Sequence, residues 1–319
     1  MNYLVTGGAG FIGSHLCEYL AGKGHRVTVL DDLSTGSRDN LSRLQKNPEF
    51  QLVVDSVLNR PAVEELVREA DVIFHLAAAV GVRTVIERSL HSLKTNIDGT
   101  ANVLEAASSS SRKVIFASTS EVYGKNENIP FAEENDIVLG ATAIRRWGYA
   151  CSKALDEFLA LAYFTEQKVP VVIVRLFNTI GPRQTGRYGM VVPRFIGQAL
   201  AGRPITIYGD GRQTRCFTYV SDVVDALYLL SGKNSVAGCV FNIGTREEIS
   251  ILQLAEKVKA LCRSNSRITH ISPEKVYLEG FEDMRRRVPD LTRVEKAIGY
   301  RPGVTLDEAL RKIIASFKE

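Results

Sequence analysis

The sequence has few cysteines and no long apolar run, and these absences narrow the class of protein. Its five cysteines are odd in number and show no Cys-x-x-Cys spacing, which argues against a disulfide framework and favours a reducing compartment. No segment reaches the roughly 18 uncharged apolar residues of a membrane helix; the longest candidate, Val72 to Val82, contains His75 and Gly81. A strand pattern starts at Asn2, where a signal peptide would need a basic stretch and an apolar core. We therefore expect a cytoplasmic protein with no membrane partner.

The sequence also lacks a marked excess of positive or negative charge. The 40 basic and 36 acidic residues leave a net charge of +4, and the densest basic cluster, Arg285 to Arg287, is three residues long. This balance is too weak to indicate a nucleic-acid partner. The five histidines show no His-x-His or His-Glu-x-x-His spacing, so we expect no metal site. What remains is the composition of an ordinary globular chain of 319 residues, long enough for about two domains.

Short β-branched runs alternate with longer helical patterns through the first half of the chain. Near-continuous apolar strands joined by helices predict a parallel sheet covered on both faces, an α/β doubly wound (Rossmann) fold. The pattern predicts strands at 3–6, 26–30, 50–54, 71–76, 113–118 and 169–176, helices at 11–23, 61–68, 90–107 and 148–167, and a loop at 108–111.

The pattern changes after Phe177. Residues 178–190 are rich in Gly, Arg and Thr and have little periodicity. Beyond them we expect helices at 191–200, 222–230 and 251–262, strands at 205–208 and 240–243, and a terminal helix. We assign 1–177 and 218–262 to a dinucleotide-binding domain, and 178–217 and 263–319 to a smaller mixed substrate-binding domain that caps the carboxyl edge of the sheet.

A glycine-rich turn joins the first strand to the first helix. Gly8-x-Gly10-x-x-Gly13 fits the dinucleotide fingerprint, and Gly7-x-x-Gly10-x-x-Gly13 fits a close variant. Glycines there let the backbone approach a pyrophosphate at a helix N-terminus. Asp31, at the end of the second strand, can accept hydrogen bonds from ribose hydroxyls and would repel a 2′-phosphate, which favours NAD over NADP. The alternative is a glycine-rich turn that binds nothing.

Tyr149 and Lys153 lie four residues apart in a predicted helix, so they share one face. A lysine charge lowers the pKa of a nearby phenol, and such a tyrosine can act as a general base near neutral pH. Many such pairs are only solvated helix surface. Thr119, Ser120 and Glu121 follow the fifth strand at its carboxyl end, where catalytic groups lie in this architecture, and they favour the catalytic interpretation.

At this point the sequence resembles the extended short-chain dehydrogenase/reductase family, the NAD-dependent nucleotide-sugar epimerases, dehydratases and decarboxylases. The matching segments run in order through almost the whole chain and are specific in combination. They are TGGAGFIGSHL (6–16), DDLSTG (31–36), HLAA (75–78), STSEVYG (118–124), YACSK (149–153), RLFNTIGPR (175–183), VVPRFI (191–196), IYGDGRQTRCFTYVSDV (207–223), FNIG (241–244) and RRRVPDLTRVEKAIGYRP (285–302).

The resemblance implies a role for each matching position. Tyr149 would be the catalytic base, Lys153 would bind the nicotinamide ribose, Thr119 would hold the reacting hydroxyl, and Glu121 would act at the sugar. The family is mostly homodimeric through helices that match 90–107 and 148–167. NAD would lie against Gly7, Gly10, Phe11, Ile12, Gly13, Asp31, Asp55, Ala77, Tyr149 and Lys153, and a UDP-sugar against Ser120, Arg146, Asn178, Val192, Tyr208, Arg215 and Arg287, with the diphosphate on Asn178, Arg215 and Arg287.

Members of this family share a first step, oxidation of the sugar at C4, and differ in the later steps. Glu121 resembles decarboxylases and dehydratases, because simple 4-epimerases usually place a small residue there. Arg145-Arg146-Trp147 and the Glu282-Asp283 loop resemble UDP-glucuronate decarboxylases, and a guanidinium near C6 could bind the carboxylate, although both arginines could equally be solvated. Residues 178–187 resemble the epimerases of the family as much as they resemble its decarboxylases. We expect decarboxylation of UDP-glucuronate to UDP-xylose or its 4-keto pentose; the alternatives are a UDP-glucose or UDP-glucuronate 4-epimerase, a 4,6-dehydratase, and a non-catalytic NAD-binding regulatory protein.

Overall fold

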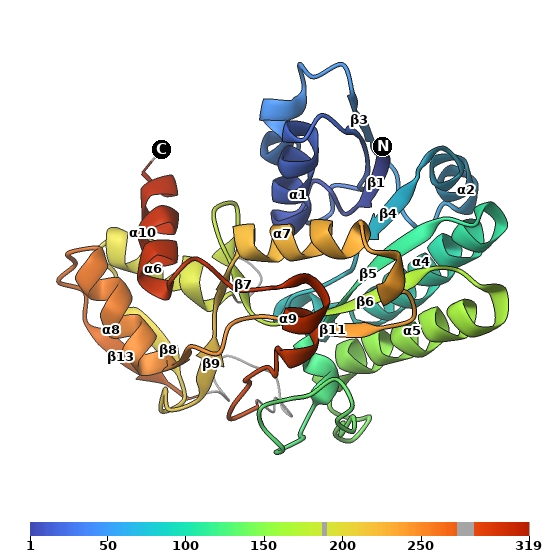
Figure 1. The fold of residues 1–319 in the computed structure, drawn as a ribbon. Helices are drawn as coiled ribbons and strands as arrows, with labels where there is room; N and C mark the ends of the chain where they lie inside the picture. The colour runs from blue at the N-terminus through green and yellow to red at the C-terminus, as the bar shows by residue number, and fades with distance from the viewer. Residues whose placement is uncertain (187–189, 273–283, 319) are drawn as a thin grey trace.

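A parallel sheet of seven strands forms the centre of the protein, whose computed structural model describes residues 1–186, 190–272 and 284–318 (Figure 1). In the strand order β1 is an interior strand, with β2 and β3 on one side and the four later strands on the other. The strands are, in spatial order, β11 (Val240–Ile243), β6 (Val171–Leu176), β5 (Lys113–Thr119), β4 (Val72–His75), β1 (Asn2–Thr6), β2 (Arg26–Leu30) and β3 (Phe50–Val53).

Alternation along each strand explains why helices cover both faces. Leu4 pairs with Ile73 and belongs to one hydrophobic core, whereas its neighbour Val5 pairs with Phe74 and belongs to the core of the opposite face. Helices α2 (Arg60–Glu69), α4 (Ser89–Ser110) and α5 (Arg146–Gln167) cover the Leu4 face, and α1 (Phe11–Gly22), α7 (Val220–Ser231) and α9 (Thr292–Ile298) cover the Val5 face. The predicted doubly wound fold is confirmed.

A smaller hydrophobic core lies beside the sheet. It joins α6 (Val191–Leu200), α8 (Ile251–Leu261), α10 (Leu306–Ser316) and β8 (Ile205–Tyr208), and β8 pairs with β13 (Ile268–Ile271) (Figure 1). The division into two domains remains a proposal. Because α8 shares this core, we propose that it belongs to the smaller domain, and that α9, which packs on the sheet, belongs to the larger one.

Several boundaries differ from the predicted ones. The serine run predicted as a loop continues α4 to Ser110, and only Ser111 turns into the left-handed region, at φ 51°. Helix α5 begins at Arg146, two residues earlier than predicted, and α7 begins at Val220. Strand β13 and helix α9 were not predicted, nor were these short elements: α3 (Val82–Glu87), η1 (Arg38–Leu44), η2 (Ser120–Tyr123), η4 (Asn234–Val236), β7 (Thr179–Ile180), β9 (Thr214–Cys216), β10 (Thr218–Tyr219) and β12 (Glu248–Ser250).

In the described ranges, none of the helices combines the length and the apolar character that crossing a lipid bilayer requires.

Candidate active site

A cavity of about 720 Å³ opens at the carboxyl ends of the central strands. It lies beside β1 and β4, where the strand order changes direction: β2 and β3 are added on one side of β1, and β4 and the later strands on the other. It is lined by the glycine turn, the ends of β2, β4, β5 and β6, the start of α5 and the smaller core. Of the predicted site residues, these line it: Gly7, Gly10, Phe11, Ile12, Gly13, Asp31, Asp55, Ala77, Thr119, Ser120, Glu121, Arg146, Tyr149, Asn178, Val192, Tyr208, Arg215 and Arg287.

The glycine turn leaves the N-terminus of α1 open to the cavity. Gly7 has φ +72°, and a Cβ there would lie 2.7 Å from the backbone nitrogen of Ala77. A Cβ on Gly13 would lie 2.3 Å from the Gly7 carbonyl oxygen. Gly10 caps α1 without a side chain, and no acidic residue lies in the first turn. The free N–H groups and the helix dipole therefore form a site for an anion such as a pyrophosphate.

Replacing Gly13 with alanine is expected to abolish dinucleotide binding and to lower the free energy of unfolding by several kcal/mol, since backbone rather than a flexible side chain blocks the new methyl group. Gly22→Ala is the matched control, because Gly22 lies in the same helix with nothing within 4 Å of its Cβ position. That change should be neutral or stabilising. Calorimetry with NAD and chemical denaturation measure both effects; a Gly13→Ala protein that binds NAD normally would contradict the assignment.

Asp31 ends β2 and faces the glycine turn. Its carboxylate accepts hydrogen bonds from the backbone N–H groups of Ala9, at 2.9 Å, and Leu33, at 2.8 Å. Burial raises the pKa of Asp31, and the two backbone bonds act against this rise. A carboxylate with two bonds still has acceptor capacity for a ribose hydroxyl. Asp55 accepts from Ser56 and from Asn59, at 2.7 and 2.6 Å, and also lines the cavity.

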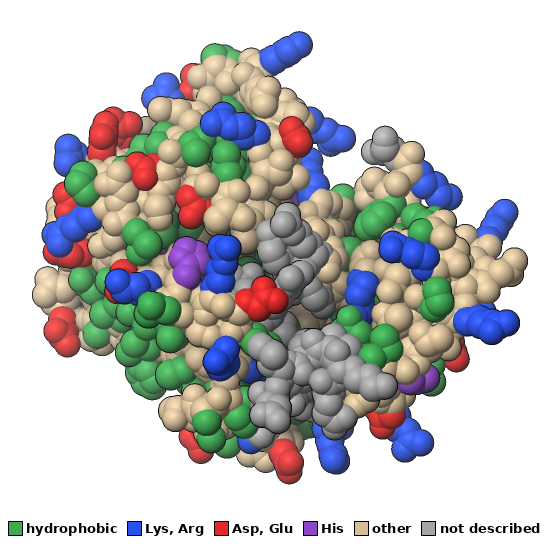
Figure 2. Space-filling model, turned by 180° about the vertical axis from the view of Figure 1, so that it is seen from behind, with side chains coloured by type: hydrophobic (Ala, Val, Ile, Leu, Met, Phe, Trp, Pro, Cys, Tyr) green, Lys and Arg blue, Asp and Glu red, His purple; other side chains and the backbone are tan. Residues whose placement is uncertain are grey.

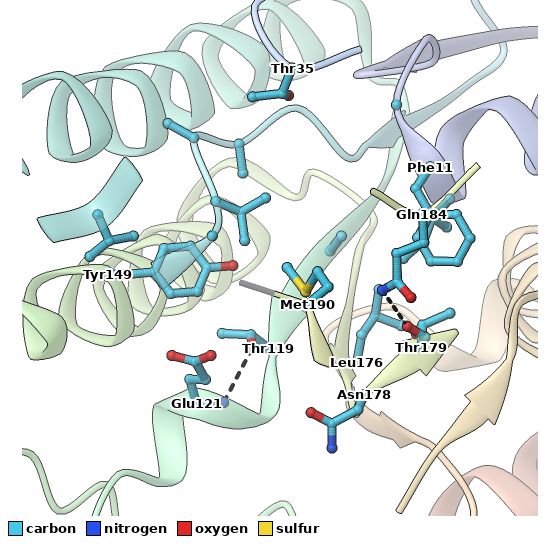
Figure 3. Close-up of a pocket in the computed structure, with 18 of the residues that line it drawn as sticks. Phe11, Thr35, Thr119, Glu121, Tyr149, Leu176, Asn178, Thr179, Gln184 and Met190 are labelled. Atoms are coloured by element: carbon cyan, nitrogen blue, oxygen red, sulfur yellow. Dashed lines mark hydrogen bonds between the residues drawn. The ribbon is translucent and has the colours of Figure 1, made fainter. Parts of the chain in front are cut away.

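Tyr149, Thr119 and Glu121 converge where β5 ends (Figure 3). The Thr119 side chain accepts a hydrogen bond from the backbone of Glu121, at 3.2 Å, which fixes the first turn of η2. The Tyr149 hydroxyl points into the cavity, and its hydrogen bond with Thr119 acts to lower the pKa of the phenol. The predicted convergence of helix and strand end is therefore present in the fold.

The pKa of Tyr149 nevertheless lies above its usual range, because the side chain is buried and because Glu121 and Asp156 repel the phenolate. The sequence predicted that Lys153 lowers the pKa of this phenol; the structure contradicts this prediction, because the pKa is raised and burial is the largest cause. Arg287 and the Thr119 hydrogen bond lower the pKa of Tyr149 but do not outweigh burial. A positive charge brought into the cavity would lower the pKa of this phenol and favour its action as a base near neutral pH.

Lys153 differs from the other predicted residues, because it does not line the cavity. It lies one turn below Tyr149 and is wholly buried, with its ammonium 3.5 Å from Asp156 and 3.9 Å from the centroid of the Phe116 ring. Burial lowers the pKa of Lys153, while Asp156 raises it. The shared helix face is confirmed, and the predicted contact of Lys153 with a ribose remains a prediction.

Three polar side chains meet beside the tyrosine. The guanidinium Nη1 of Arg287 lies 3.4 Å from the Ser120 hydroxyl and 3.9 Å from the Glu121 carboxylate. Arg287 is only 6% exposed, so it contributes a desolvated positive charge at this end of the cavity. We call Ser120, Glu121 and Arg287 the carboxyl-end cluster.

The predicted Arg145-Arg146-Trp147 segment separates into two kinds of residue. Arg146 is buried at the start of α5, lines the cavity and lies 5.6 Å from the Trp147 ring. Arg145 is exposed, and its side chain donates to the Ile86 carbonyl at 3.4 Å. Of the two possibilities that the sequence left open, Arg145 is therefore a solvated arginine, and Arg146 is an arginine that lines the cavity.

The opposite wall is formed by the loop after β6 and by the smaller core. Asn178 donates to the Cys216 carbonyl at 3.2 Å, and Arg215 donates to the Thr214 carbonyl at 2.7 Å. The guanidinium of Arg194 lies over the Tyr208 ring, 3.8 Å from its centroid, and Val192 packs in the smaller core. This wall presents amide, guanidinium and aromatic groups across from Tyr149.

A buried ion pair supports the strand end from behind. Arg175 on β6 binds Glu157 on α5 at 2.7 Å, and Glu157 also accepts a hydrogen bond from Ser118, the residue before Thr119. Burial acts to lower the pKa of Arg175, but its bonds to Glu157 raise it above the usual range. A pair held this firmly fixes β5, β6 and α5 relative to one another, and with them Thr119 and Tyr149.

Sequence reasoning missed some residues that line the cavity. Thr35 and Gln184 reach it, and both stand in segments that carry the resemblance or adjoin it, so the signal was present. Asn40 donates to the Ala9 carbonyl at 2.8 Å, and His91 lies at the start of α4; no pattern in the sequence singles them out. Arg187, Glu282 and Asp283, which the resemblance includes, lie outside the described residues.

The chain matches known proteins over nearly its whole length. Residues 4–313 match the sequence model of the GDP-mannose 4,6-dehydratase family. The chain belongs to this family. The family forms part of the extended short-chain dehydrogenase/reductases, so the predicted resemblance is confirmed.

Two similar relatives within this family are named as decarboxylases. The chain is 46% identical to a UDP-N-acetyl-α-D-glucosaminuronate decarboxylase from Bacillus cytotoxicus, over 99% of this chain and 97% of the relative. It is 38% identical to UDP-glucuronic acid decarboxylase 1 from Xenopus tropicalis, over 99% of this chain and 72% of the relative. A similar solved structure is a variant of UDP-glucuronic acid 4-epimerase from Bacillus cereus, in complex with a fluorinated UDP-glucuronic acid and NAD, with a TM-score of 0.89, 31% identity and coverage of 100% of this chain and 99% of that chain.

Proposed function

We propose that this family member is an NAD-dependent decarboxylase of a UDP-hexuronic acid, either UDP-glucuronate or UDP-N-acetylglucosaminuronate. The observation that carries the proposal is the carboxyl-end cluster, a buried arginine beside Ser120 and Glu121 at the side of Tyr149. A positive charge in that place suits a sugar with a carboxylate at C6. The two decarboxylase relatives support the same reaction.

The cavity fits NAD. The open N-terminus of α1 and the close approach of Gly7 to Ala77 suit a pyrophosphate, and Asp31 suits an unphosphorylated ribose. The epimerase structure with NAD bound supports the same cofactor. When bound, NAD supplies an acceptor for the hydride of C4 and, in its oxidised form, the additional positive charge that Tyr149 lacks.

Tyr149 and Thr119 are proposed to act on the C4 hydroxyl. Thr119 holds the hydroxyl by a hydrogen bond, and Tyr149 takes its proton as C4 becomes a ketone. A ketone at C4 makes the C6 carboxylate β to a carbonyl, so the carboxylate can leave as CO₂ while its electron pair passes into the carbonyl. C5 then takes a proton, and Tyr149 returns its own when C4 is reduced again.

The carboxyl-end cluster is proposed to act at C5 and C6. Arg287 would hold the carboxylate before it leaves, and the Glu121 carboxylate would take a proton from solvent and pass it to C5. This places Arg287 at C6 instead of the diphosphate that the resemblance implied. Arg146 would face the same sugar, and the wall of Asn178, Val192, Tyr208 and Arg215 would hold the UDP moiety.

Product analysis tests the proposed function. The purified protein is incubated with NAD and each of the two acids carrying ¹³C at C6, and the products are followed by NMR. The proposal expects labelled CO₂ and a UDP-pentose, or its 4-keto form, without a stoichiometric supply of NAD. A second candidate is a UDP-glucuronate 4-epimerase, which the epimerase structure favours. A product that keeps its label and is inverted at C4 would establish that candidate and reject decarboxylation.

We also propose that the protein forms a homodimer through α4 and α5. Leu90, Leu155 and Phe158 lie on these two helices and are 71%, 48% and 67% exposed. Figure 2 shows hydrophobic side chains gathered on the side of the molecule where α4 and α5 lie. A second copy of the same face would remove these side chains from water.

Replacing Phe158 with glutamate is therefore expected to convert the dimer to a monomer, because each interface would receive two buried carboxylates without partners. Sedimentation velocity measures the change. Leu229→Glu is the matched control, because Leu229 is also 48% exposed but lies on α7, on the other face of the sheet. Wild-type protein that sediments as a monomer, or a Phe158→Glu dimer, would reject the proposed interface.

A further inference from the structure

A buried carboxylate below the active site has no part in the proposed chemistry. Asp156 is 0% exposed, and within the described part of the chain neither of its oxygens has a hydrogen-bond partner of ordinary geometry. Burial raises the pKa of Asp156 to about 6, so the side chain is mostly ionised at neutral pH. A buried, ionised and unsatisfied carboxylate is costly and calls for a specific reason.

Two groups lie next to this carboxylate. The Lys153 ammonium is 3.5 Å from Oδ2, and the opposite side of the ammonium is covered by the Phe116 ring. The Thr100 hydroxyl on α4 faces the same carboxylate and acts to lower its pKa. Asp156 therefore stands between the Lys153 ammonium, one helical turn from Tyr149, and the Thr100 hydroxyl on α4.

Thr100 continues into a chain of polar groups that runs from α4 over β4 to β1 on one face of the sheet. Its hydroxyl lies 3.2 Å from Nε2 of His75 on β4, and Nδ1 of His75 lies 2.8 Å from the Thr6 hydroxyl on β1. The Thr6 hydroxyl accepts the backbone N–H of Ala77 at 3.3 Å. Ala77 lines the cavity and packs against Gly7, so the chain ends at the wall that faces the dinucleotide.

The ionised carboxylate gives this chain one direction. Because a carboxylate only accepts, the Thr100 hydroxyl that faces Asp156 directs its single hydrogen toward the carboxylate, and its oxygen can then only accept from His75. Burial lowers the pKa of His75 to about 3, so the ring is neutral and carries one hydrogen, which must be on Nε2. Nδ1 then accepts from Thr6, and the Thr6 oxygen accepts from Ala77.

We propose that Asp156 is a positioning residue with two effects: it is the counter-ion that keeps the buried Lys153 charged below Tyr149, and it is the negative end of a directed chain of polar groups, Ala77–Thr6–His75–Thr100–Asp156, that fixes the Ala77 wall of the cavity. The kinetic part rests on the proposed role of Tyr149 and Lys153, whereas the chain and the charge of Lys153 do not depend on the reaction.

Other titratable groups have to be considered for the charge of Lys153. Glu157 on the same helix also raises its pKa, but Arg175 already neutralises Glu157. His75 on β4 is neutral, Phe116 on β5 and Thr100 on α4 carry no charge, and Tyr149 is protonated until the reaction. Asp156 is therefore the unneutralised negative charge against Lys153.

The experiment separates the charge from the chain with two substitutions. Asp156→Asn keeps the shape and an oxygen that accepts from Thr100 but removes the charge, whereas Thr100→Val keeps the charge and breaks the chain. We expect Asp156→Asn to move the alkaline limb of the pH profile of kcat/KM down by about one to three pH units, because Lys153 loses its proton earlier. Thr100→Val should leave that limb in place and raise the KM for NAD.

Spectroscopy gives readouts that need no turnover. In wild-type protein, ¹⁵N NMR of His75 should show the hydrogen on Nε2, and ¹³C-labelled lysine should show the Lys153 pKa falling in Asp156→Asn but not in Thr100→Val. Asp222→Asn is the control, because Asp222 is a buried carboxylate on α7 that accepts from Val304 at 3.2 Å. A wild-type His75 protonated on Nδ1, or a Lys153 pKa unchanged in Asp156→Asn, would overturn the inference. Normal NMR results with no decarboxylation would instead reject only the proposed function.

Discussion

Replacing Tyr149 with phenylalanine is expected to lower kcat for CO₂ release by roughly 10²–10⁴-fold, the range of a lost general base. The aromatic ring stays in its buried position, so binding of NAD and of the UDP-sugar should change little. In the proposed reaction the phenol takes the C4 proton, because the Thr119 hydroxyl is a poor base and Glu121 is assigned to C5. Without that step no ketone forms, and no carboxylate becomes labile.

The pH dependence of the wild-type rate follows from the same group. Burial and the neighbouring carboxylates raise the pKa of Tyr149, so the active phenolate is lost as the pH falls, and the acid limb of kcat reports Tyr149 in the ternary complex. Tyr163→Phe is the matched control, because Tyr163 lies on the same helix and does not line the cavity. A Tyr149→Phe protein with near-normal turnover, or a Tyr163→Phe protein with an equal loss, would show that another group removes the proton.

The sequence predicted the parts of this site that lie on one continuous segment. The glycine turn, Asp31 and the strand end at Thr119 are local patterns, and their meaning depends only on a strand before and a helix after. The sheet followed from the same reasoning, since buried parallel strands are nearly all apolar and are separated by amphipathic helices. Strands of two or three residues, such as β7 and β12, carry no periodicity and could not be predicted.

The sequence could not predict features that depend on the direction in which a long side chain points. Lys153 shares a helix face with Tyr149, as predicted, but its four-carbon stem turns inward to Asp156, whose spacing of three residues from Lys153 is common on helix surfaces. Arg145 and Arg146 are adjacent in the sequence, yet one is exposed and the other buried. Arg287 joins Ser120 across 167 residues, a contact that only the tertiary fold creates.

Replacing Glu121 with glutamine is expected to separate the two halves of the reaction. The Glu121 carboxylate lies 3.9 Å from the Arg287 guanidinium and raises the pKa of the Tyr149 phenol, and in the proposed reaction it acts on the sugar beyond C4. Loss of its charge removes a repulsion that raises the pKa of Tyr149, and oxidation at C4 should therefore persist. Protonation of C5 should slow by roughly 10²-fold or more, because glutamine cannot take a proton from solvent and pass it to C5.

Two measurements distinguish these steps in Glu121→Gln. NMR should show a 4-keto sugar accumulating during turnover, which the wild-type protein does not accumulate to the same extent. In D₂O, the wild-type protein should place deuterium at one of the two C5 positions of the pentose, whereas the variant should distribute it over both, because solvent replaces a fixed donor. Glu127→Gln makes the same chemical change at an exposed position of the loop after η2 and should behave as wild type. If C4 oxidation and C5 protonation fell equally, or if deuteration stayed stereospecific, Glu121 would not be the C5 acid, and the proton would have to come from another member of the carboxyl-end cluster.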